Sequence, residues 1–423
     1  MLKKMMGLAI VLLVFGSGFT FAAGGETISI LVHKDPYYDG IGKVLPEFEK
    51  QTGITVNLEG VPYDGLRTKE MTDFVGGTAQ YDVDAIIAGF VSSFANGNYL
   101  EPLDKYIDKD KSQLNMNDFS KGILQVDQWK GVQYALPLAA YVNFILYRKD
   151  LFQEHNLKAP KTWDEYLADV KALTTNGMYG TAVNARRGMP IVDMFFSFFV
   201  DFGAQWFTRF PDQPWDLHPV VNSEAGIKAL TFYKELIKYS PPGVLNYDWF
   251  DTGSAFWTGK VAIIFDWDSY AAFSNDPSQS KIVGKVAYAP PPGTGYGSLG
   301  GPSLAINAAS KHKQAAWELI KFLTKAQTET TMVKESGYSS PSRLSVFDDP
   351  GAVKLCPWFP AQKQAIANVV PWYQPNMPVL PQMAEILGLR INQCLIGEMS
   401  PKDALDKANS EITALLQKDG YLK

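Results

Sequence analysis

Short apolar strands alternate with amphipathic helices along most of this chain, and that alternation restricts its fold more than any other feature. Residues 27–32 have the composition of a buried strand. Ile41, Val44 and Phe48 then recur on one face of a helix, and Gly53 follows where a glycine can end it. Further strands are expected at residues 54–58, 82–88, 143–147 and 261–265. The alternation predicts an α/β fold.

Two later helices carry their own start signals. Thr162 stands three residues before Glu165, which is the spacing of a capping box. Ser400 precedes Pro401 and Asp403, so a hydroxyl cap, a proline in the first turn and an early acid follow one another. These signals predict helices that begin after Thr162 and after Ser400.

The first 23 residues have the features of a secretory signal peptide. Lys3 and Lys4 form a basic start, residues 5–15 are apolar, and Thr20-Phe21-Ala22 offers a small-x-small cleavage site. The apolar run is short for a bilayer, so a retained membrane anchor is the less favoured alternative. No cysteine near the cut could carry a lipid, and we predict a mature chain that is free in the periplasm or secreted.

Length and charge restrict the organisation and the partners of the mature chain. A chain of about 400 residues is too long for one ordinary hydrophobic core and suits two domains of about 200 residues each. Loss of Lys3 and Lys4 would take the formal charge from -5 to -7. This balance argues against binding to nucleic acid or to an anionic membrane surface, and it favours a neutral or cationic ligand.

The cysteines and histidines offer no metal motif. Cys356 and Cys394 are the two cysteines, and an oxidising compartment would allow them to form a disulfide, with two separate buried thiols as the alternative. The histidines are scattered without the spacing of metal ligands: His33, His155, His218 and His312. We expect neither a zinc site nor a cofactor.

Enzyme motifs are also missing from the sequence. Residues 295–300 match the glycine pattern of dinucleotide-binding turns, but prolines precede them instead of a strand, and Gly301-Pro302 follows instead of a helix. There is no phosphate-binding loop and no Gly-x-Ser-x-Gly turn. Glycosidases stay open as a class because they need only two carboxylates.

Aromatic residues make up 13% of the chain, including 10 tryptophans and 20 tyrosines. Several fall in loop-like stretches where packing alone would not require them. A flat ring can cover the C–H face of a sugar while polar side chains bind the hydroxyls around its edge. This composition is compatible with carbohydrate binding, although core packing is the alternative for any single tryptophan.

Five segments occur in an order that is typical of one family. They are residues 45–56 (LPEFEKQTGITV), 134–152 with YALP and LYRKDLF at its ends, 256–267 (FWTGKVAIIFDW), 300–323 with GGPSLAINAAS and AWELIKFL, and 397–405 (GEMSPKDAL). With this set the chain resembles the family 1 extracellular solute-binding proteins, the maltose-binding-protein-like receptors of ATP-driven importers. The resemblance extends over nearly the whole mature chain.

The resemblance implies two α/β lobes built from discontinuous segments, with a hinge between them and the solute bound in the cleft. The N-terminal lobe would contain residues 24–138 and 304–338, and the C-terminal lobe residues 139–303 and 339–423. The resemblance also implies a monomeric protein with two functional partners: a small sugar-like solute and the permease subunits of an inner-membrane ABC importer. Hinge closure would bury the solute.

The candidate ligand-binding residues are chosen either because the resemblance implies them or because they follow a predicted strand. Trp267 matches a position where relatives stack a tryptophan on the ligand, while Tyr141 replaces a carboxylate that some relatives use, which argues against maltodextrin. Gly300 and Gly301 match a loop whose backbone can approach hydroxyls, with a plain hinge turn as the alternative. The remaining candidates rest on placement alone: Tyr37, Tyr38, Asp39, Phe90, Arg186, Arg187, Trp206, Trp249, Asp266 and Asp268.

Two other functions stay open at this point. Arg186 and Arg187 could form bidentate contacts with an anion, which would suit a phosphorylated polyol or a sugar acid. Asp266 and Asp268 beside tryptophans could belong to a secreted glycoside hydrolase. Alternate residues of one strand point the same way, however, whereas hydrolysis needs carboxylates on both sides of the scissile bond.

Overall fold

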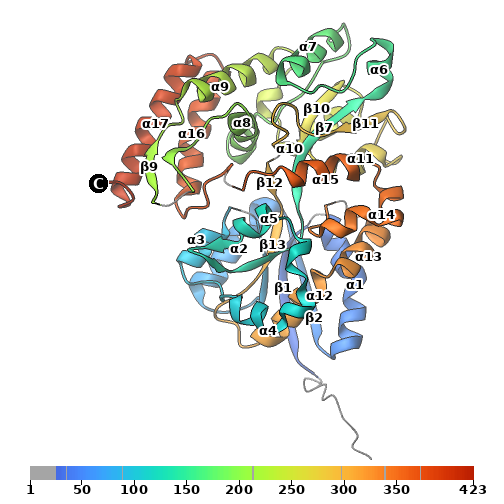
Figure 1. Ribbon diagram of the computed structural model, residues 1–423, viewed down its shortest axis with the longest axis vertical. Coiled ribbons are helices and arrows are strands. Elements are labelled where there is room, and N and C mark those ends of the chain that lie inside the picture. Colours follow the sequence, from blue (N-terminus) through green and yellow to red (C-terminus); the bar gives the residue numbers. More distant parts are fainter. Residues whose placement is uncertain are drawn as a thin grey trace, which may run out of the picture.

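The computed structural model describes residues 25–423 apart from residues 35, 88, 212–213, 297, 338–339 and 372. The predicted signal peptide lies outside the described residues. Two lobes stand one above the other (Figure 1), the lower built around the N-terminal strands and the upper around β7 and β10. Among the described residues, none of the helices is both long enough and apolar enough to span a membrane.

A five-stranded sheet in the order β2-β1-β3-β13-β6 forms the centre of the N-terminal lobe. The strands are β1 Thr27–His33, β2 Thr55–Val61, β3 Val83–Ile87, β6 Ala135–Pro137 and β13 Pro302–Ile306. β1 runs parallel to β2 and β3, so the carboxyl ends of these three strands meet at one edge. β13 comes from much later in the chain and inserts antiparallel between β3 and β6.

Helices and a small hairpin surround this sheet. α1 (Pro36–Thr52) covers the sheet with Ile41, Val44 and Phe48, all buried as predicted, and it ends before Gly53, whose φ is +72°. The other elements are α2 Tyr63–Gly76, α3 Val91–Asn96, α4 Asp104–Leu114, a 3-10 turn Met116–Asp118, α5 Lys121–Val126, β4 Gln128–Trp129, β5 Val132–Gln133, α12 Lys313–Leu323 and α13 Ala326–Ser336.

The sheet of the C-terminal lobe is built on the long strand β7, Tyr141–Arg148. β10 (Ile263–Trp267) pairs antiparallel with one edge of β7, and β11 (Val286–Ala289) and the short β12 (Leu299–Gly300) pair with it as well. The register places Trp267 opposite Asn143 and Gly300 opposite Tyr141. The start of β7, the end of β10 and β12 therefore meet at the side of the lobe that faces the N-terminal lobe.

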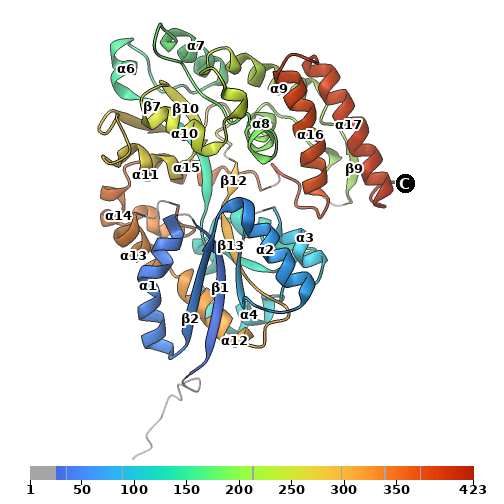
Figure 2. The ribbon, with the colours of Figure 1, turned by 180° about the vertical axis from the view of Figure 1, so that it is seen from behind.

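Helices cover both faces of this second sheet, and α16 and α17 pack beside α8 and α9 at one end of the lobe (Figure 2). The predicted caps are confirmed: the Thr162 hydroxyl accepts from the Glu165 amide at 3.1 Å, and the Ser400 hydroxyl accepts from the Asp403 amide at 3.1 Å. The elements are α6 Lys149–Glu154, α7 Trp163–Leu173, α8 Met189–Asp201, β8 Phe207–Arg209, β9 Asp216–Pro219, α9 Glu224–Ile237, a 3-10 turn Val244–Asn246, α10 Trp249–Trp257, α11 Ser269–Asn275, α15 Phe359–Ala367, α16 Leu380–Leu395 and α17 Pro401–Lys418. A 3-10 turn at Leu344–Asp348 and α14 (Pro350–Leu355) pack against α13 of the N-terminal lobe.

The chain passes between the two sheets at residues 138–140 and again at Gly301. Gly301 has a φ of +105°, and a Cβ there would lie 2.4 Å from the Ala139 carbonyl oxygen, so only glycine suits this close crossing. β13 begins at Pro302, two residues before the boundary at residue 304 that the sequence suggested. A third passage, which includes Ser340, runs beside the first: the Ala140 amide donates to the Ser340 carbonyl at 3.0 Å.

The two cysteines are separate buried thiols, so the disulfide that the sequence left open is not present. Cys356 follows α14 and lies near Tyr288, whereas Cys394 is in α16 near Lys234. Burial raises the pKa of the Cys356 thiol to about 12 and also raises that of Cys394. Both thiols are therefore protonated at neutral pH, which makes them poor nucleophiles.

We expect the melting temperature of the protein to be the same with and without dithiothreitol. A disulfide would contribute about 2–4 kcal/mol, and its reduction would lower the melting temperature by several degrees. Thiol labelling in guanidinium without reductant should count two reactive cysteines per chain. A count of zero, with a reductant-sensitive melting temperature, would contradict the separation of Cys356 and Cys394.

Candidate functional site

The two lobes touch along the edge at which the strands of the N-terminal sheet end. The rings of Tyr63, at the start of α2, and Trp249, at the start of α10, meet at 5.5 Å in an edge-to-face contact. The Asn376 amide nitrogen of the C-terminal lobe donates to the carbonyls of Val126 and Gln128 at 3.2 and 2.7 Å. The two lobes are therefore in direct contact at this edge of the N-terminal sheet.

Aromatic side chains of the N-terminal lobe gather at this edge. His33 ends β1, and its ring lies 5.6 Å from that of Tyr63 and 6.4 Å from that of Tyr37. Burial lowers the pKa of His33 to about 4, so the imidazole is neutral at physiological pH. With Trp249 these residues form a continuous chain of rings across the two lobes, which we call the aromatic bridge: His33, Tyr37, Tyr63 and Trp249.

Trp267 forms a second aromatic surface in the C-terminal lobe. A Cβ on Gly300 would lie 3.0 Å from one ring atom of Trp267 and 3.2 Å from another, so the indole rests on the bare backbone of β12. Because opposite residues in antiparallel strands share a face, Asn143 lies on the same face as Trp267, and Tyr141 on that of Gly300. Trp267 and Tyr141 are half-buried. The sequence-predicted Trp267, Tyr141 and Gly300 are thus brought together.

Two buried carboxyl groups belong to the same region. Asp266 has no exposed surface, and its Oδ1 accepts from the Trp267 amide at 2.8 Å and the Asn184 side chain at 3.3 Å. Burial raises the pKa of Asp266 to about 8. Asp193 on α8 accepts from the Gln374 side chain, and burial raises its pKa to about 7. The charge of Asp193 also contributes to the raised pKa of Asp266.

Several polar atoms of this region are buried and lack a protein partner. They include the Trp249 indole nitrogen, the Asn143 Oδ1 atom and the Asp266 Oδ2 atom. Buried donors and acceptors in native proteins are normally satisfied, so such atoms are available to a bound molecule. Hydroxyl groups suit both kinds of atom, because a hydroxyl can donate to an oxygen and accept from an indole nitrogen.

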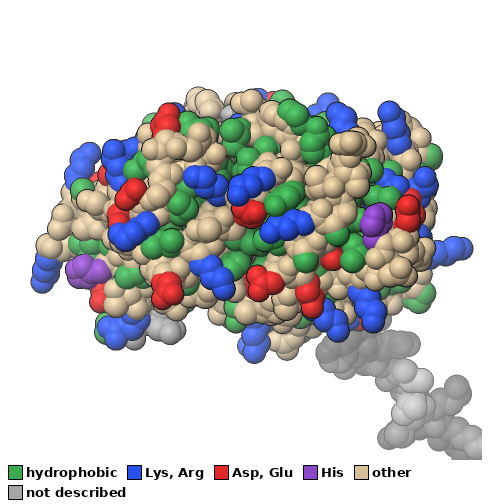
Figure 3. Space-filling view, turned by 90° about the horizontal axis from the view of Figure 1, so that it is seen from above, with side chains coloured by type: hydrophobic (Ala, Val, Ile, Leu, Met, Phe, Trp, Pro, Cys, Tyr) green, Lys and Arg blue, Asp and Glu red, His purple; other side chains and the backbone are tan. Residues whose placement is uncertain are grey.

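The predicted arginines have carboxylate partners on the surface. Arg186 lies 3.3 Å from Asp248, and Arg187 lies 3.3 Å from Glu385, and both guanidinium groups are exposed. Neither guanidinium is an unpaired cation in a buried site. Lysines and arginines are interspersed with acids on the outer face of the C-terminal lobe (Figure 3), so this face carries no broad patch of one charge.

Four other sequence-predicted residues have packing or hydrogen-bond partners of their own or are exposed. Trp206 is 4% exposed, packs among phenylalanines in the lobe core and donates to the Tyr373 carbonyl at 2.9 Å, so its ring faces are covered. Phe90 stacks under the Arg67 guanidinium at 4.1 Å. Tyr38 packs on Gly60 of β2, and Asp39 is exposed on α1.

Sequence reasoning missed His33, Tyr63, Asp193 and Gln374. The rule that ligand-facing residues follow parallel strands was applied to Tyr37, and it would also have found His33 at the end of β1 and Tyr63 just after β2. Asp193 lies inside the apolar helix α8, where an acid among phenylalanines is itself a signal of a special role. No pattern marked Gln374.

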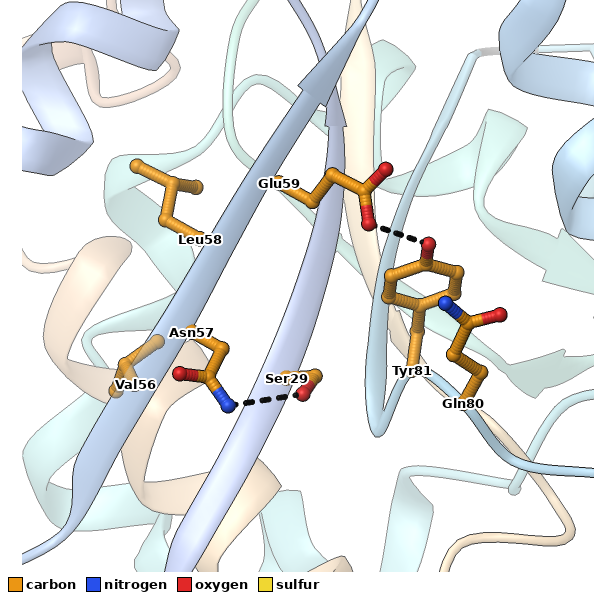
Figure 4. A pocket seen from close by; sticks show the side chains of 7 residues that line it. All are labelled: Ser29, Val56, Asn57, Leu58, Glu59, Gln80 and Tyr81. Carbon is orange, nitrogen blue, oxygen red and sulfur yellow. Dashed lines mark hydrogen bonds between the residues drawn. The ribbon is translucent and has the colours of Figure 1, made fainter.

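A shallow groove on the outer surface of the N-terminal lobe is a less suitable site. It lies on β1 and β2 (Figure 4), away from the contact between the lobes, and it is lined by Ser29, Val56, Asn57, Leu58, Glu59, Gln80 and Tyr81. The Glu59 carboxylate already accepts from the Tyr81 hydroxyl at 2.6 Å and pairs with Lys69. Within the described parts of the chain, no group of histidine, cysteine and acidic side chains could hold a metal ion.

Comparison with known proteins agrees with this architecture. The family model described as bacterial extracellular solute-binding protein matches residues 35–330. A crystal structure of an ABC transporter solute-binding protein from Agrobacterium radiobacter K84, in complex with ribitol, is 32% identical, with a TM-score of 0.82 and coverage of 93% of this chain and 99% of that one. The predicted two-lobed α/β fold is therefore confirmed.

Curated relatives extend over nearly the full length as well. A mannitol-binding protein of Pseudomonas aeruginosa is 26% identical and covers 95% of this chain and 96% of its own. A probable amino-acid ABC transporter periplasmic-binding protein of Sinorhizobium fredii is 25% identical, with 94% and 91% covered. These relatives are solute-binding proteins rather than enzymes. The chain belongs to the bacterial extracellular solute-binding proteins, the substrate-binding components of ABC transporters.

Proposed function

We propose that this protein binds an uncharged polyol or a small sugar between its lobes and delivers it from the periplasm to the permease subunits of an ABC importer, without catalysis. The observation that carries the proposal is a pair of buried polar atoms without a protein partner, Trp249 Nε1 in the aromatic bridge and Asn143 Oδ1 on the sheet face of Trp267. Hydroxyl groups can satisfy such atoms while the rings cover the C–H faces of the same molecule. The similarity to ribitol-bound and mannitol-binding proteins supports this ligand class.

The charge of the site favours a neutral solute over an anion. Asp193 and Asp266 are buried on the C-terminal side, and above their raised pKa values of about 7 and about 8 each would repel a carboxylate or phosphate. Arg186 and Arg187, the residues that motivated an anionic ligand, are engaged by Asp248 and Glu385. A phosphorylated polyol or sugar acid would therefore enter an acidic site without an arginine pair to hold it.

The arrangement of Asp266 and Asp268 also favours a receptor over a glycoside hydrolase. Asp268 has no exposed surface, and its carboxylate accepts from the Val142 amide at 3.0 Å and the Ser340 hydroxyl at 2.5 Å. Both carboxyls come from the end of one strand instead of from opposite sides of a cleft. This geometry does not supply the opposed acid and base that hydrolysis needs.

A thermal-shift panel tests the proposed ligand class. We expect ribitol, D-mannitol or a small neutral sugar to raise the melting temperature of the mature protein, because a ligand at 100 times its Kd adds about 2.7 kcal/mol of stability. Calorimetric titration should confirm one site per chain, and chromatography should recover the ligand unchanged. Stabilisation only by sugar phosphates, sugar acids or amino acids would contradict a neutral ligand, and product formation would contradict the receptor function.

A further inference from the structure

Asp193 is an acid in an otherwise apolar stretch of α8, whose neighbouring side chains are packed into the core of the C-terminal lobe. It retains 9% of its surface, whereas Ile191, Val192, Phe195 and Phe196 retain none. The Gln374 side chain is the one hydrogen-bond donor to its carboxylate within the described chain. A buried carboxylate with a single donor has acceptor capacity left for another molecule.

Gln374 connects this acid to the opposite lobe. It lies in the loop between α15 and α16 of the C-terminal lobe and is 8% exposed. A Cβ on Gly89, which follows β3 in the N-terminal lobe, would lie 3.2 Å from the Gln374 Oε1 atom. Gly89 has a φ of +90°, so glycine suits the backbone as well as the approach. One amide therefore reaches Asp193 in its own lobe and Gly89 across the interface.

The surroundings of Asp193 also link it to the rest of the interlobe site. Asp193 contributes to the raised pKa of Tyr373 and of Asp266, with burial as the larger cause in both cases. Tyr63 of the aromatic bridge acts on Tyr373 in the same way. Tyr373 therefore lies near both Asp193 and Tyr63, and Asp193 lies near Asp266. Tyr373 thus connects Asp193 with the aromatic bridge.

We propose that Asp193 binds hydroxyl groups of the solute and is the residue that makes the site select uncharged polyols over the corresponding acids, with Gln374 holding its carboxylate in place. This inference rests on the proposed function. A carboxylate oxygen accepts from hydroxyl donors, and two adjacent hydroxyls of a polyol can share one carboxylate. An acid of the same carbon skeleton would place a second negative charge beside it.

Asp193→Asn is the decisive variant, because asparagine keeps the shape of aspartate and can still pair with the Gln374 amide. Affinities for ribitol, D-mannitol, D-ribonate and D-mannonate should be measured by calorimetric titration at about pH 8.5, where Asp193 is ionised despite its raised pKa of about 7, in the wild type and the variant. We expect the variant to bind the polyols about 10- to 100-fold more weakly, the effect of losing a hydrogen bond to a charged group. Binding of the two acids should be unchanged or stronger. Asp419→Asn, which neutralises an exposed aspartate near the C-terminus, should bind all four as the wild type does.

The outcomes separate this inference from the proposed function. If the wild type binds neither polyol, the proposed function fails and this inference fails with it. If the wild type binds a polyol and Asp193→Asn retains its affinity and its preference within threefold, the role of Asp193 is wrong while the proposed function stands. Should Asp193→Asn not fold, Gln374→Ala decides: a fivefold or larger loss of polyol affinity supports the inference, and an unchanged affinity overturns it.

Discussion

Replacing Asp268 with alanine is expected to cause the largest loss of stability of any single change at the hinge. The carboxylate has no exposed surface and accepts hydrogen bonds from the Val142 amide, the Ser340 hydroxyl and the Gln362 side chain. These donors belong to the start of β7, to the third passage between the lobes and to α15. Asp268 therefore joins three segments that are distant in the sequence.

The expected cost of Asp268→Ala is about 3 kcal/mol in the free energy of unfolding, because it leaves three buried donors without their acceptor. Urea denaturation followed by circular dichroism measures this cost. Asp108→Ala is the matched control, since Asp108 is an exposed aspartate on α4, and it should change the stability by less than about 0.5 kcal/mol. A loss below about 1 kcal/mol for Asp268→Ala would show that the hinge is held by other contacts.

Trp267→Ala is expected to have the largest effect on ligand affinity. The indole lies on the backbone of Gly300, beside Asn143 and Tyr141, and it is half-buried, so its removal takes away a flat contact surface more than a part of the core. Loss of an aromatic contact at the centre of a binding site costs about 2 kcal/mol, which corresponds to roughly 30-fold in Kd. Trp267→Phe should retain part of the affinity.

Calorimetric titration with the best ligand of the thermal-shift panel measures this effect. Trp215→Ala is the control, because Trp215 is also half-buried but packs on Phe210 beside the β8–β9 hairpin. It should leave the affinity unchanged. An affinity within threefold of the wild type for Trp267→Ala would remove this residue from the site, whereas a similar loss in both variants would indicate a general disturbance of the C-terminal lobe.

Most of the architecture could be predicted from the sequence, because its signals act over short distances. Apolar spacing marks α1 and the strands, hydroxyl caps mark the starts of α7 and α17, and Gly53 ends α1 through a backbone conformation that glycine adopts readily. The observed strands differ from the predicted ones by up to three residues at their ends. Such ends depend on pairing with neighbouring strands as well as on local composition.

The candidate site could be predicted only in part. Trp267, Tyr141 and Gly300 were found because they match the sequence pattern of a family, and the pairing of β7 with β10 and β12 brings them together. Trp206 and Trp249 gave the same local signal, yet Trp206 lies in the core and Trp249 reaches Tyr63 in the other lobe. Burial and orientation depend on what packs against a side chain, which its sequence neighbours do not specify.

Local sequence by itself determined the strands, the helices and their caps, since each depends on residues a few positions apart. Tertiary structure alone decided that Gln374 pairs with Asp193 and approaches Gly89, and that Cys356 and Cys394 stay apart. These relations join residues from distant parts of the chain, and they follow from the repeated passage of the chain between the two lobes. The energy of such contacts depends on the packing of whole elements, so no short sequence window contains it.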